Sequence, residues 1–586
     1  MRDCPNFLVQ VLTSLMLAGC IEQAYQDGTG LAPTVTEPAT SGGNSPTTTG
    51  ALPTTSEGVD ATPVASVTGS TEETMSSSTD PGPAMTTTGD PGENLPPKIE
   101  LFEVTDVVGS PIDHISEAGS ALLQLKVSAD AVKVRLYLDG VLLEELAPAD
   151  FPYTWEALSA KNNGPKRIFK VVALDAEELT DEATAQLGVQ LPASGAPKCL
   201  FEDPDKGSLA SEISAVKYTS KAIIAVGKKD VGAGWRLTVW LLDPDHCEVI
   251  LPGWPKTIAS WSGGDEFDKL TSVGTAVDLD EDGNIVVGGN FLVDGKTQSY
   301  VALLNAAGSL LWEQAGQVGG EVTSVAAARA QFKNRVFVGG VQHTSDNPVR
   351  TDGAIWVYVA TDDKVFVGPP VILAAPFTPD ELSDPKNARS EWVRAIVIHP
   401  GTGYAMGVGE REFSPDGLKV YSRTFTVQVH PLGFLVATPW TSKAETGLLH
   451  DAARSVGACG DGFLAGGWTR DVPANAKPQP MIFWLGTDGS ATQHRPEPQL
   501  ASTQIHGIAC DREGKIVSAG TRTTVSADAQ VFTITGLFDA PSWYETGDSS
   551  DDGAGAVACD ERGFCGWGGY RTANGKPYAV VRVHNP

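Results

Sequence analysis

The sequence has few basic residues. Its 586 residues include 42 Lys and Arg against 72 Asp and Glu, which is a formal net charge of −30. Phosphate binding requires clustered Lys and Arg, so the deficit argues against nucleic acid as a partner. It also argues against a polybasic contact with anionic lipid.

Common catalytic and metal-binding motifs are missing as well. The nine histidines form no HExxH or HxH motif, and the chain has no GxSxG, P-loop, CxxC or CxxCH sequence. We therefore expect no cofactor, apart from the calcium hypothesis below. After residue 19, no run is apolar enough to span a membrane.

The first twenty residues resemble an export signal. Arg2 precedes an apolar stretch, residues 7–17, which is too short to span a bilayer. The sequence Leu17-Ala18-Gly19-Cys20 follows and resembles the lipobox of bacterial lipoproteins. The resemblance implies a signal peptide over 1–19 and a diacylglycerol on Cys20; an ordinary cleaved signal is the alternative. We expect an extracytoplasmic protein whose partner is the membrane, through lipid on Cys20, with the outer membrane as the expected site.

Residues 20–96 are rich in Ser, Thr, Pro and Gly, and residues 21–96 contain no Lys or Arg. Such a segment cannot bury enough apolar area to offset chain entropy, so we expect it to be disordered. It resembles the spacers of lipoproteins displayed by Gram-negative bacteria. That resemblance implies a tether that holds the folded part away from the membrane, with surface exposure.

In residues 97–195, apolar and polar residues alternate over short stretches, as they do in half-buried β-strands. Lys98 to Val104 alternates apolar and polar residues, and about seven such strands fit into the segment. The phrases 134–140, 152–155 and 169–175 resemble bacterial Ig-like modules, which implies a small β-sandwich used as a spacer or in adhesion. We expect Trp155 to be a core residue.

Residues 198–586 are internally repetitive. A complete unit, 272–312, reads as four short strands, and a glycine ends the second strand of each copy: Gly227, Gly289, Gly340, Gly409, Gly467, Gly520 and Gly569. Glycine there permits a close approach where strands crowd. The unit resembles the β-propeller repeats of secreted bacterial proteins. The resemblance implies an all-β fold, a seven-bladed β-propeller preceded by the small Ig-like sandwich.

The last copy ends after its third strand. We expect the segment near 199–205 to supply the fourth strand and close the ring, because closure removes open sheet edges. Eight blades remain the alternative if residues 361–388 contain extra strands.

Six cysteines follow Cys20. An extracytoplasmic compartment permits disulfides, although six cysteines allow 15 pairings and the connectivity stays open. The repeat positions suggest the pairs Cys559–Cys565, Cys459–Cys510 and Cys199–Cys247.

Asp278, Asp280 and Asp282 match the first half of a calcium loop, D-x-D-x-D-G. The ninth and twelfth positions of such a loop are Val286 and Gly289 here, so a plain hairpin turn is the favoured interpretation and Ca²⁺ the alternative.

Four arginines follow the second strand in successive copies: Arg411, Arg470, Arg522 and Arg571. They predict a basic arc on the loops between the second and third strands, which would bind an anionic partner. Solvated loop charges are the other interpretation. Long loops such as 341–353 make that face a natural binding surface.

Together these features favour a non-catalytic lipoprotein, displayed at the cell surface or in the periplasm, whose propeller binds a protein or a glycan. The alternative is an extracytoplasmic propeller enzyme, a hydrolase, a lyase or a quinoprotein-type oxidoreductase. A propeller fold alone does not decide between them.

Overall fold

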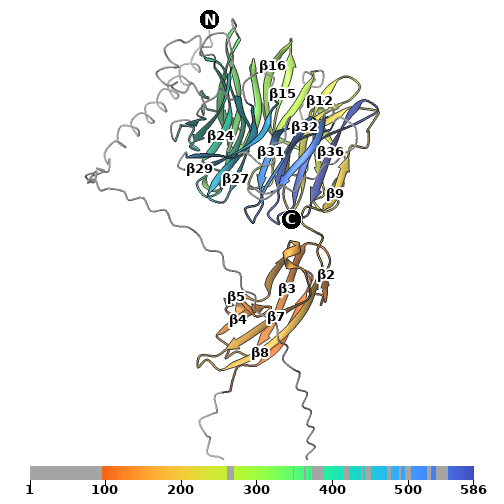
Figure 1. Cartoon of the computed structure of the whole chain (residues 1–586), viewed down its shortest axis with the longest axis vertical. Helices are drawn as coiled ribbons and strands as arrows, with labels where there is room; N and C mark the ends of the chain where they lie inside the picture. Colours follow the sequence, from red (N-terminus) through yellow and green to blue (C-terminus); the bar gives the residue numbers. More distant parts are fainter. Residues whose placement is uncertain are drawn as a thin grey trace, which may run out of the picture. The chain divides into compact units, whose positions relative to one another are not determined.

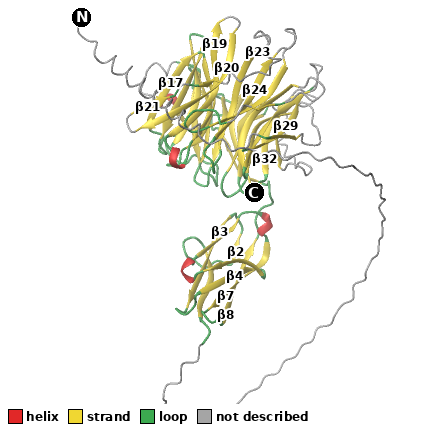
Figure 2. Ribbon diagram, turned by 90° about the vertical axis from the view of Figure 1, so that its left-hand side faces the viewer, coloured by secondary structure: helices red, strands yellow, loops and turns green. Residues whose placement is uncertain are grey.

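The structure of this protein is a computed structural model. It describes residues 95–260, 270–346, 349–361, 364–368, 370–372, 388–413, 421–436, 440–442, 450–470, 477–487, 490–494, 503–523, 529–535 and 552–586. Within these ranges the chain is all-β and its helices are single 3₁₀ turns (Figure 2). A membrane-spanning helix, long and apolar enough, does not occur in them. The expected signal peptide, Cys20 and the tether up to residue 94 lie outside the described residues.

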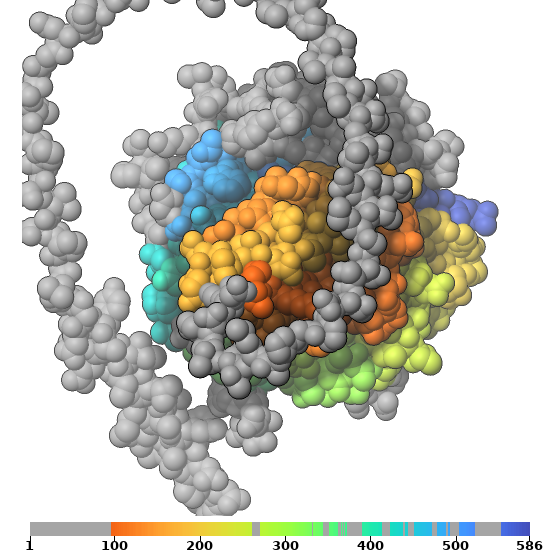
Figure 3. Space-filling view, turned by 90° about the horizontal axis from the view of Figure 1, so that it is seen from below, coloured from red at the N-terminus to blue at the C-terminus, as the bar shows by residue number. Residues whose placement is uncertain are grey.

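Residues 99–189 form two packed sheets, drawn in orange in Figure 3. One has the order β1-β3-β6, with β1 (Ile99–Thr105), β3 (Gly119–Val127) and β6 (Tyr153–Ala157). The other has the order β2-β8-β7-β4-β5, with β2 (His114–Ile115), β8 (Thr180–Val189), β7 (Gly164–Leu174), β4 (Lys133–Leu138) and β5 (Val141–Leu146).

The core between these sheets follows the predicted alternation. Leu123 and Leu136 are completely buried. Trp155 is 7% exposed, so it is the core residue that the sequence predicts. Its ring meets Phe169 edge-on, with ring centroids 5.0 Å apart.

From Pro197 the chain forms antiparallel sheets whose strands follow one another in sequence (Figure 1). The first two sheets consist of β10 (Ser211–Tyr218), β11 (Ile223–Asp230), β12 (Trp235–Leu242) and β13 (Lys256–Thr257), then β14 (Ser272–Leu279), β15 (Ile285–Val293), β16 (Lys296–Leu304) and β17 (Leu310–Val318).

The next strands form one nine-stranded sheet, β18 (Gly320–Ala327), β19 (Arg335–Asp346), β20 (Val349–Thr361), β21 (Lys364–Val367), β22 (Val371–Ile372), β23 (Ala388–Ile398), β24 (Ala405–Phe413), β25 (Tyr421–Val429) and β26 (Trp440–Thr441). A single parallel bridge, Thr351 to Ser390, joins its two halves. Both β21 and β22 pair with β20. They therefore extend an existing sheet, in the region where the sequence left an extra blade open, and residues 373–387 lie outside the described ranges.

Three further sheets complete the chain. They are β27 (His450–Cys459), β28 (Gly462–Arg470), β29 (Gln479–Gly486) and β30 (Ala491–His494), then β31 (Thr503–Cys510), β32 (Ile516–Thr523) and β33 (Ala529–Thr535), then β34 (Gly553–Cys559), β35 (Cys565–Ala573), β36 (Lys576–His584) and β9 (Pro197–Glu202).

One strand from each of these sheets, and two from the nine-stranded sheet, form a closed ring. We call β10, β14, β18, β23, β27, β31 and β34 the inner strands. Each inner strand contacts the next, and the last, β34, contacts the first, β10. In addition, β9 pairs with β36, so a segment before the first inner strand completes the last sheet. This is a propeller-type closure, in which radial repetition protects the sheet edges.

Every inner strand carries a β-bulge at the same place. In the first, Ile213 pairs with Gly227 and Ala215 with Val226, which leaves Ser214 without a register partner. The corresponding bulge residues in the other strands are Thr275, Thr323, Arg394, Arg454, His506 and Gly555. The glycine that marks each copy therefore lies opposite the bulge.

The bulge explains this glycine. A Cβ atom at Gly227 would stand 1.9 Å from the carbonyl oxygen of Glu212, and one at Gly409 would stand 1.8 Å from that of Trp392. The close approach predicted from the sequence is thus to the neighbouring inner strand.

Three disulfides are present: Cys199–Cys247, Cys459–Cys510 and Cys559–Cys565. The second joins the ends of the adjacent inner strands β27 and β31, and the third spans the hairpin between β34 and β35. Disulfides persist in oxidising compartments, so they indicate an extracytoplasmic location.

Candidate functional site

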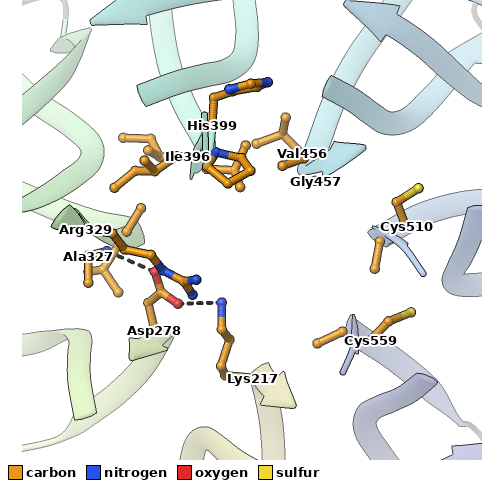
Figure 4. Close-up of a pocket in the computed structure, with 18 of the residues that line it drawn as sticks. Lys217, Asp278, Ala327, Arg329, Ile396, His399, Val456, Gly457, Cys510 and Cys559 are labelled. Atoms are coloured by element: carbon orange, nitrogen blue, oxygen red, sulfur yellow. Dashed lines mark hydrogen bonds and ion pairs between the residues drawn. The ribbon is translucent and has the colours of Figure 1, made fainter. Parts of the chain in front are cut away.

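The inner strands enclose a cavity of about 540 Å³ where they turn into their second strands. That volume is in the range of small-molecule sites. All the inner strands contribute to it (Figure 4). Its wall includes one β-branched apolar residue from each, two positions after the bulge residue: Val216, Val277, Val325, Ile396, Val456, Ile508 and Val557.

One sector of the cavity is charged. Lys217 Nζ lies 2.7 Å from Asp278 Oδ1, and the backbone N–H of Ala327 donates to Asp278 Oδ2 at 2.9 Å. Arg329 is exposed and lines the same sector. Figure 4 shows these side chains on one side of the cavity and Cys510 and Cys559 on the other. Two cations thus face one carboxylate, whose two oxygens are both engaged.

His399 lies at the turn that borders the cavity. Its Nδ1 accepts the backbone N–H groups of Gly401 and Thr402 at 3.1 and 3.2 Å, so the proton of the neutral ring is on Nε2. Nε2 is buried and has no hydrogen-bond partner within the described residues. The ring packs edge-on against Phe463. The histidine therefore holds the turn in place and leaves one polar atom unsatisfied.

The bulge residues form a second candidate feature near the axis. In four inner strands they are small, namely Ser214, Thr275, Thr323 and Gly555, whereas three successive strands have the basic residues Arg394, Arg454 and His506. Thr275 shows that these positions reach the next sheet, because its hydroxyl donates to the carbonyl of Val322 at 2.8 Å.

We call Arg394, Arg454, His506 and Glu410 the basic cluster. Arg394 Nε lies 3.0 Å and Arg454 Nη1 3.3 Å from the same oxygen, Glu410 Oε1. The Arg394 guanidinium also lies over the Trp392 ring, 5.2 Å from its centroid. Burial lowers the pKa of Arg454, and the charge of Glu410 opposes that shift. A guanidinium group carries its positive charge at neutral pH.

His506 completes the cluster. Its Nε2 lies 2.9 Å from the Thr521 hydroxyl. Burial lowers the pKa of His506 to about 4, and the positive charge of Arg454 adds to the shift. The imidazole is therefore neutral at pH 7.

The expected calcium acids do not converge. Asp278 is engaged by Lys217 and Ala327, as described. Asp280 accepts the backbone N–H of Asn284 and its side-chain amide, both at 2.8 Å, and Asp282 lies 3.7 Å from Lys333 Nζ. Across the described ranges, no group of three or more His, Cys, Asp or Glu side chains is placed to hold a metal ion. The motif forms a hairpin turn.

The four arginines expected on loops lie in strands instead. Arg411, Arg522 and Arg571 lie two residues after the marker glycine in β24, β32 and β35, while Arg470 lies three residues after it in β28. The expected loop position is wrong because each second strand continues past its glycine.

The arginine side chains that the structure describes are engaged. Arg411 Nε lies 2.6 Å from Glu391 Oε1, and both side chains are nearly buried. Arg571 lies 3.7 Å from Asp552 and 3.9 Å from Glu202. Arg470 lies over the ring of Trp468. The structure does not describe the Arg522 side chain.

Sequence reasoning missed the basic cluster. An alignment of the inner strands on their marker glycines would have placed Arg394, Arg454 and His506 in one column with Ser, Thr and Gly. That column contrast is the signal that could have found them.

No protein family model and no curated protein sequence matches the chain. Among solved structures, Sqt1 from Chaetomium thermophilum is similar, with 14% identity and a TM-score of 0.35 over 64% of this chain and 84% of that one. The polysaccharide lyase Uly1 has 10% identity and a TM-score of 0.39 over 64% and 89%. The Hadza microbial sialidase Hz136 has 10% identity and a TM-score of 0.34 over 78% and 90%.

Proposed function

We propose that this chain is a lipid-anchored binding protein of the bacterial cell envelope. Cys20 carries the lipid, residues 20–96 are the tether, residues 97–195 are an Ig-like spacer, and residues 198–586 are a propeller of seven blades. The propeller binds a protein or a glycan at the cell surface, and the outer membrane holds the anchor. The three disulfides support the extracytoplasmic part of this proposal.

The observation that carries the binding role is the axial cavity. All the inner strands line it, it has an apolar wall, and its charged sector has Lys217 and Arg329 against Asp278. Few polar groups in an apolar cavity are typical of a ligand site. Asp278 is an unsuitable general base, because Lys217 and the Ala327 N–H already occupy its oxygens.

The test is capture of ligand by the full-length protein. Immobilised protein is screened against a glycan array and against solubilised envelope proteins, and any captured molecule is assayed for turnover. We expect a saturable ligand that is recovered unchanged. Arg329→Glu should lose binding, because it reverses a charge in the cavity lining.

Lys221→Glu is the matched control, since Lys221 is an exposed lysine in a turn outside the cavity. Binding that is equally weak in both variants would overturn the cavity as the site. Chemical conversion of the captured molecule would overturn the non-catalytic role and favour a propeller hydrolase or lyase.

A further inference from the structure

The basic cluster has two positive charges and one negative charge, so one positive charge is not neutralised within it. Arg394 and Arg454 both contact Oε1 of Glu410, and these three atoms bring two guanidinium groups within about 6 Å of each other. His506 contributes no charge at pH 7. The Glu410 side chain is 7% exposed. A surplus charge in such a partly buried place is costly unless an anion balances it.

Hydrogen-bond donors in the cluster are also in surplus. A guanidinium has five N–H donors, and within the described part of the chain Arg454 uses only Nη1 for an ion pair. The Arg394 and Arg454 side chains are 25% and 28% exposed. None of their nitrogens is among the described buried atoms that lack a partner. About a quarter of each side chain is therefore accessible to a ligand.

The bulge does not require these side chains. Ser214 and Gly555 occupy the same position in other inner strands, where the backbone makes the same register shift. Arginine occupies this position in two successive inner strands, β23 and β27, as Arg394 and Arg454. A structural role in the bulge leaves the size and charge of these two residues unexplained, whereas anion binding accounts for both.

We propose that Arg394 and Arg454 together bind an oxyanion group, a carboxylate or a sulfate. The inference rests on the proposed function, because it specifies a chemical group that the bound protein or glycan would carry. Glu410 positions the two guanidinium groups and competes with the ligand for them. Arginine suits this task because its planar fork matches an oxyanion.

Isothermal titration of the full-length protein at low ionic strength tests the inference. The probes are sodium sulfate, sodium glucuronate and glucose. Saturable binding of sulfate alone assigns the site to a free inorganic anion, and tighter binding of glucuronate assigns it to a sugar acid. Glucose should give no binding. Absence of saturable binding for both anions would overturn the proposal.

Three substitutions separate anion binding from a structural role. Arg454→Gln should weaken glucuronate binding at least about tenfold, because it removes one of the two guanidinium groups that bind the anion. Glu410→Gln should tighten it by about tenfold, since the competing carboxylate is gone. Arg454→Lys keeps the charge but loses the fork, so it should weaken binding at an unchanged melting temperature. This conservative variant keeps the test valid if a glutamine variant fails to fold.

Arg135→Gln is the matched control, because Arg135 forms an exposed ion pair with Glu145 in the sandwich. An equal loss in this control would show that binding is a general surface effect. A loss of affinity in Glu410→Gln would also contradict the proposal. The titration needs no macromolecular ligand, so it can fail while the capture experiment succeeds, or succeed while the capture experiment fails.

Discussion

Gly467 lies directly beneath the carbonyl group of Ala452. A Cβ atom at Gly467 would stand 1.9 Å from that oxygen, and glycine is the residue without such an atom. The two residues belong to neighbouring strands, β28 and β27, at the bulge. The same arrangement recurs between Gly340 and Glu321 at 1.8 Å. One repeated backbone feature therefore explains the glycine that marks the copies.

Gly467→Ala should destabilise the protein by about 3 kcal/mol, because the clash is with backbone that cannot rotate away. Denaturant unfolding followed by tryptophan fluorescence measures the loss. Gly119→Ala is the control: a Cβ there meets its nearest heavy atom at 3.9 Å. Equal stability of the two variants would show that the bulge carbonyl moves freely.

The repeat and its closure could be predicted because they depend on local patterns. Marker glycines, alternating residues and turn sequences recur along the chain. A last copy that ends after its third strand therefore predicts that another segment supplies the fourth strand. β9 pairs with β36 for that reason. The propeller-type fold was accessible at this level. The bulge could not be predicted in this way. The apolar pattern of the inner strand does not show at which residue its pairing with the second strand shifts by one position.

The candidate site was less predictable. The sequence pointed to Arg411 and Arg571 as charges on loops, but both lie in strands. Glu391, directly opposite on the paired strand, engages Arg411, and Asp552, just before β34, engages Arg571. The sequence did not point to Arg454, whose partner Glu410 lies 44 positions away on a neighbouring sheet. Ion-pair partners depend on which sheets become neighbours, and that information is in the folded ring.

The buried pair of Arg411 and Glu391 gives a second prediction. Arg411→Met should cost about 3 kcal/mol, because a carboxylate that is 7% exposed loses its cation. Chemical denaturation measures the cost. Lys126→Met is the control, since its pair with Glu100 is exposed to solvent and should contribute almost nothing. A stable Arg411→Met protein with impaired ligand binding would restore the arginine to a binding role.

The disulfides should differ in their effect on stability. Replacing both Cys459 and Cys510 by Ser should cost about 4 kcal/mol, and replacing both Cys559 and Cys565 about 2 kcal/mol, because the first pair closes a much longer loop. Unfolding in urea without reductant measures both values, after peptide mapping has established the pairs. Equal losses would mean that loop length does not determine the stabilisation.

His506 predicts a pH dependence of stability. Its pKa is about 4 in the folded protein, against a usual value of 6.5. Between these pH values the unfolded chain binds a proton at His506 that the folded chain does not bind. The contribution of His506 to the free energy of unfolding is therefore fully present above pH 6.5 and is lost as the pH falls towards 4. The loss attributable to this residue is at most about 3 kcal/mol.

The measurement compares the wild type with His506→Gln, whose amide can still hydrogen-bond to Thr521. Unfolding free energies are determined from pH 7 to pH 4. The wild type should lose stability more steeply, by up to about 1.4 kcal/mol per pH unit. Parallel curves for wild type and His506→Gln would mean that water reaches His506 and that its environment does not disfavour the charged imidazole.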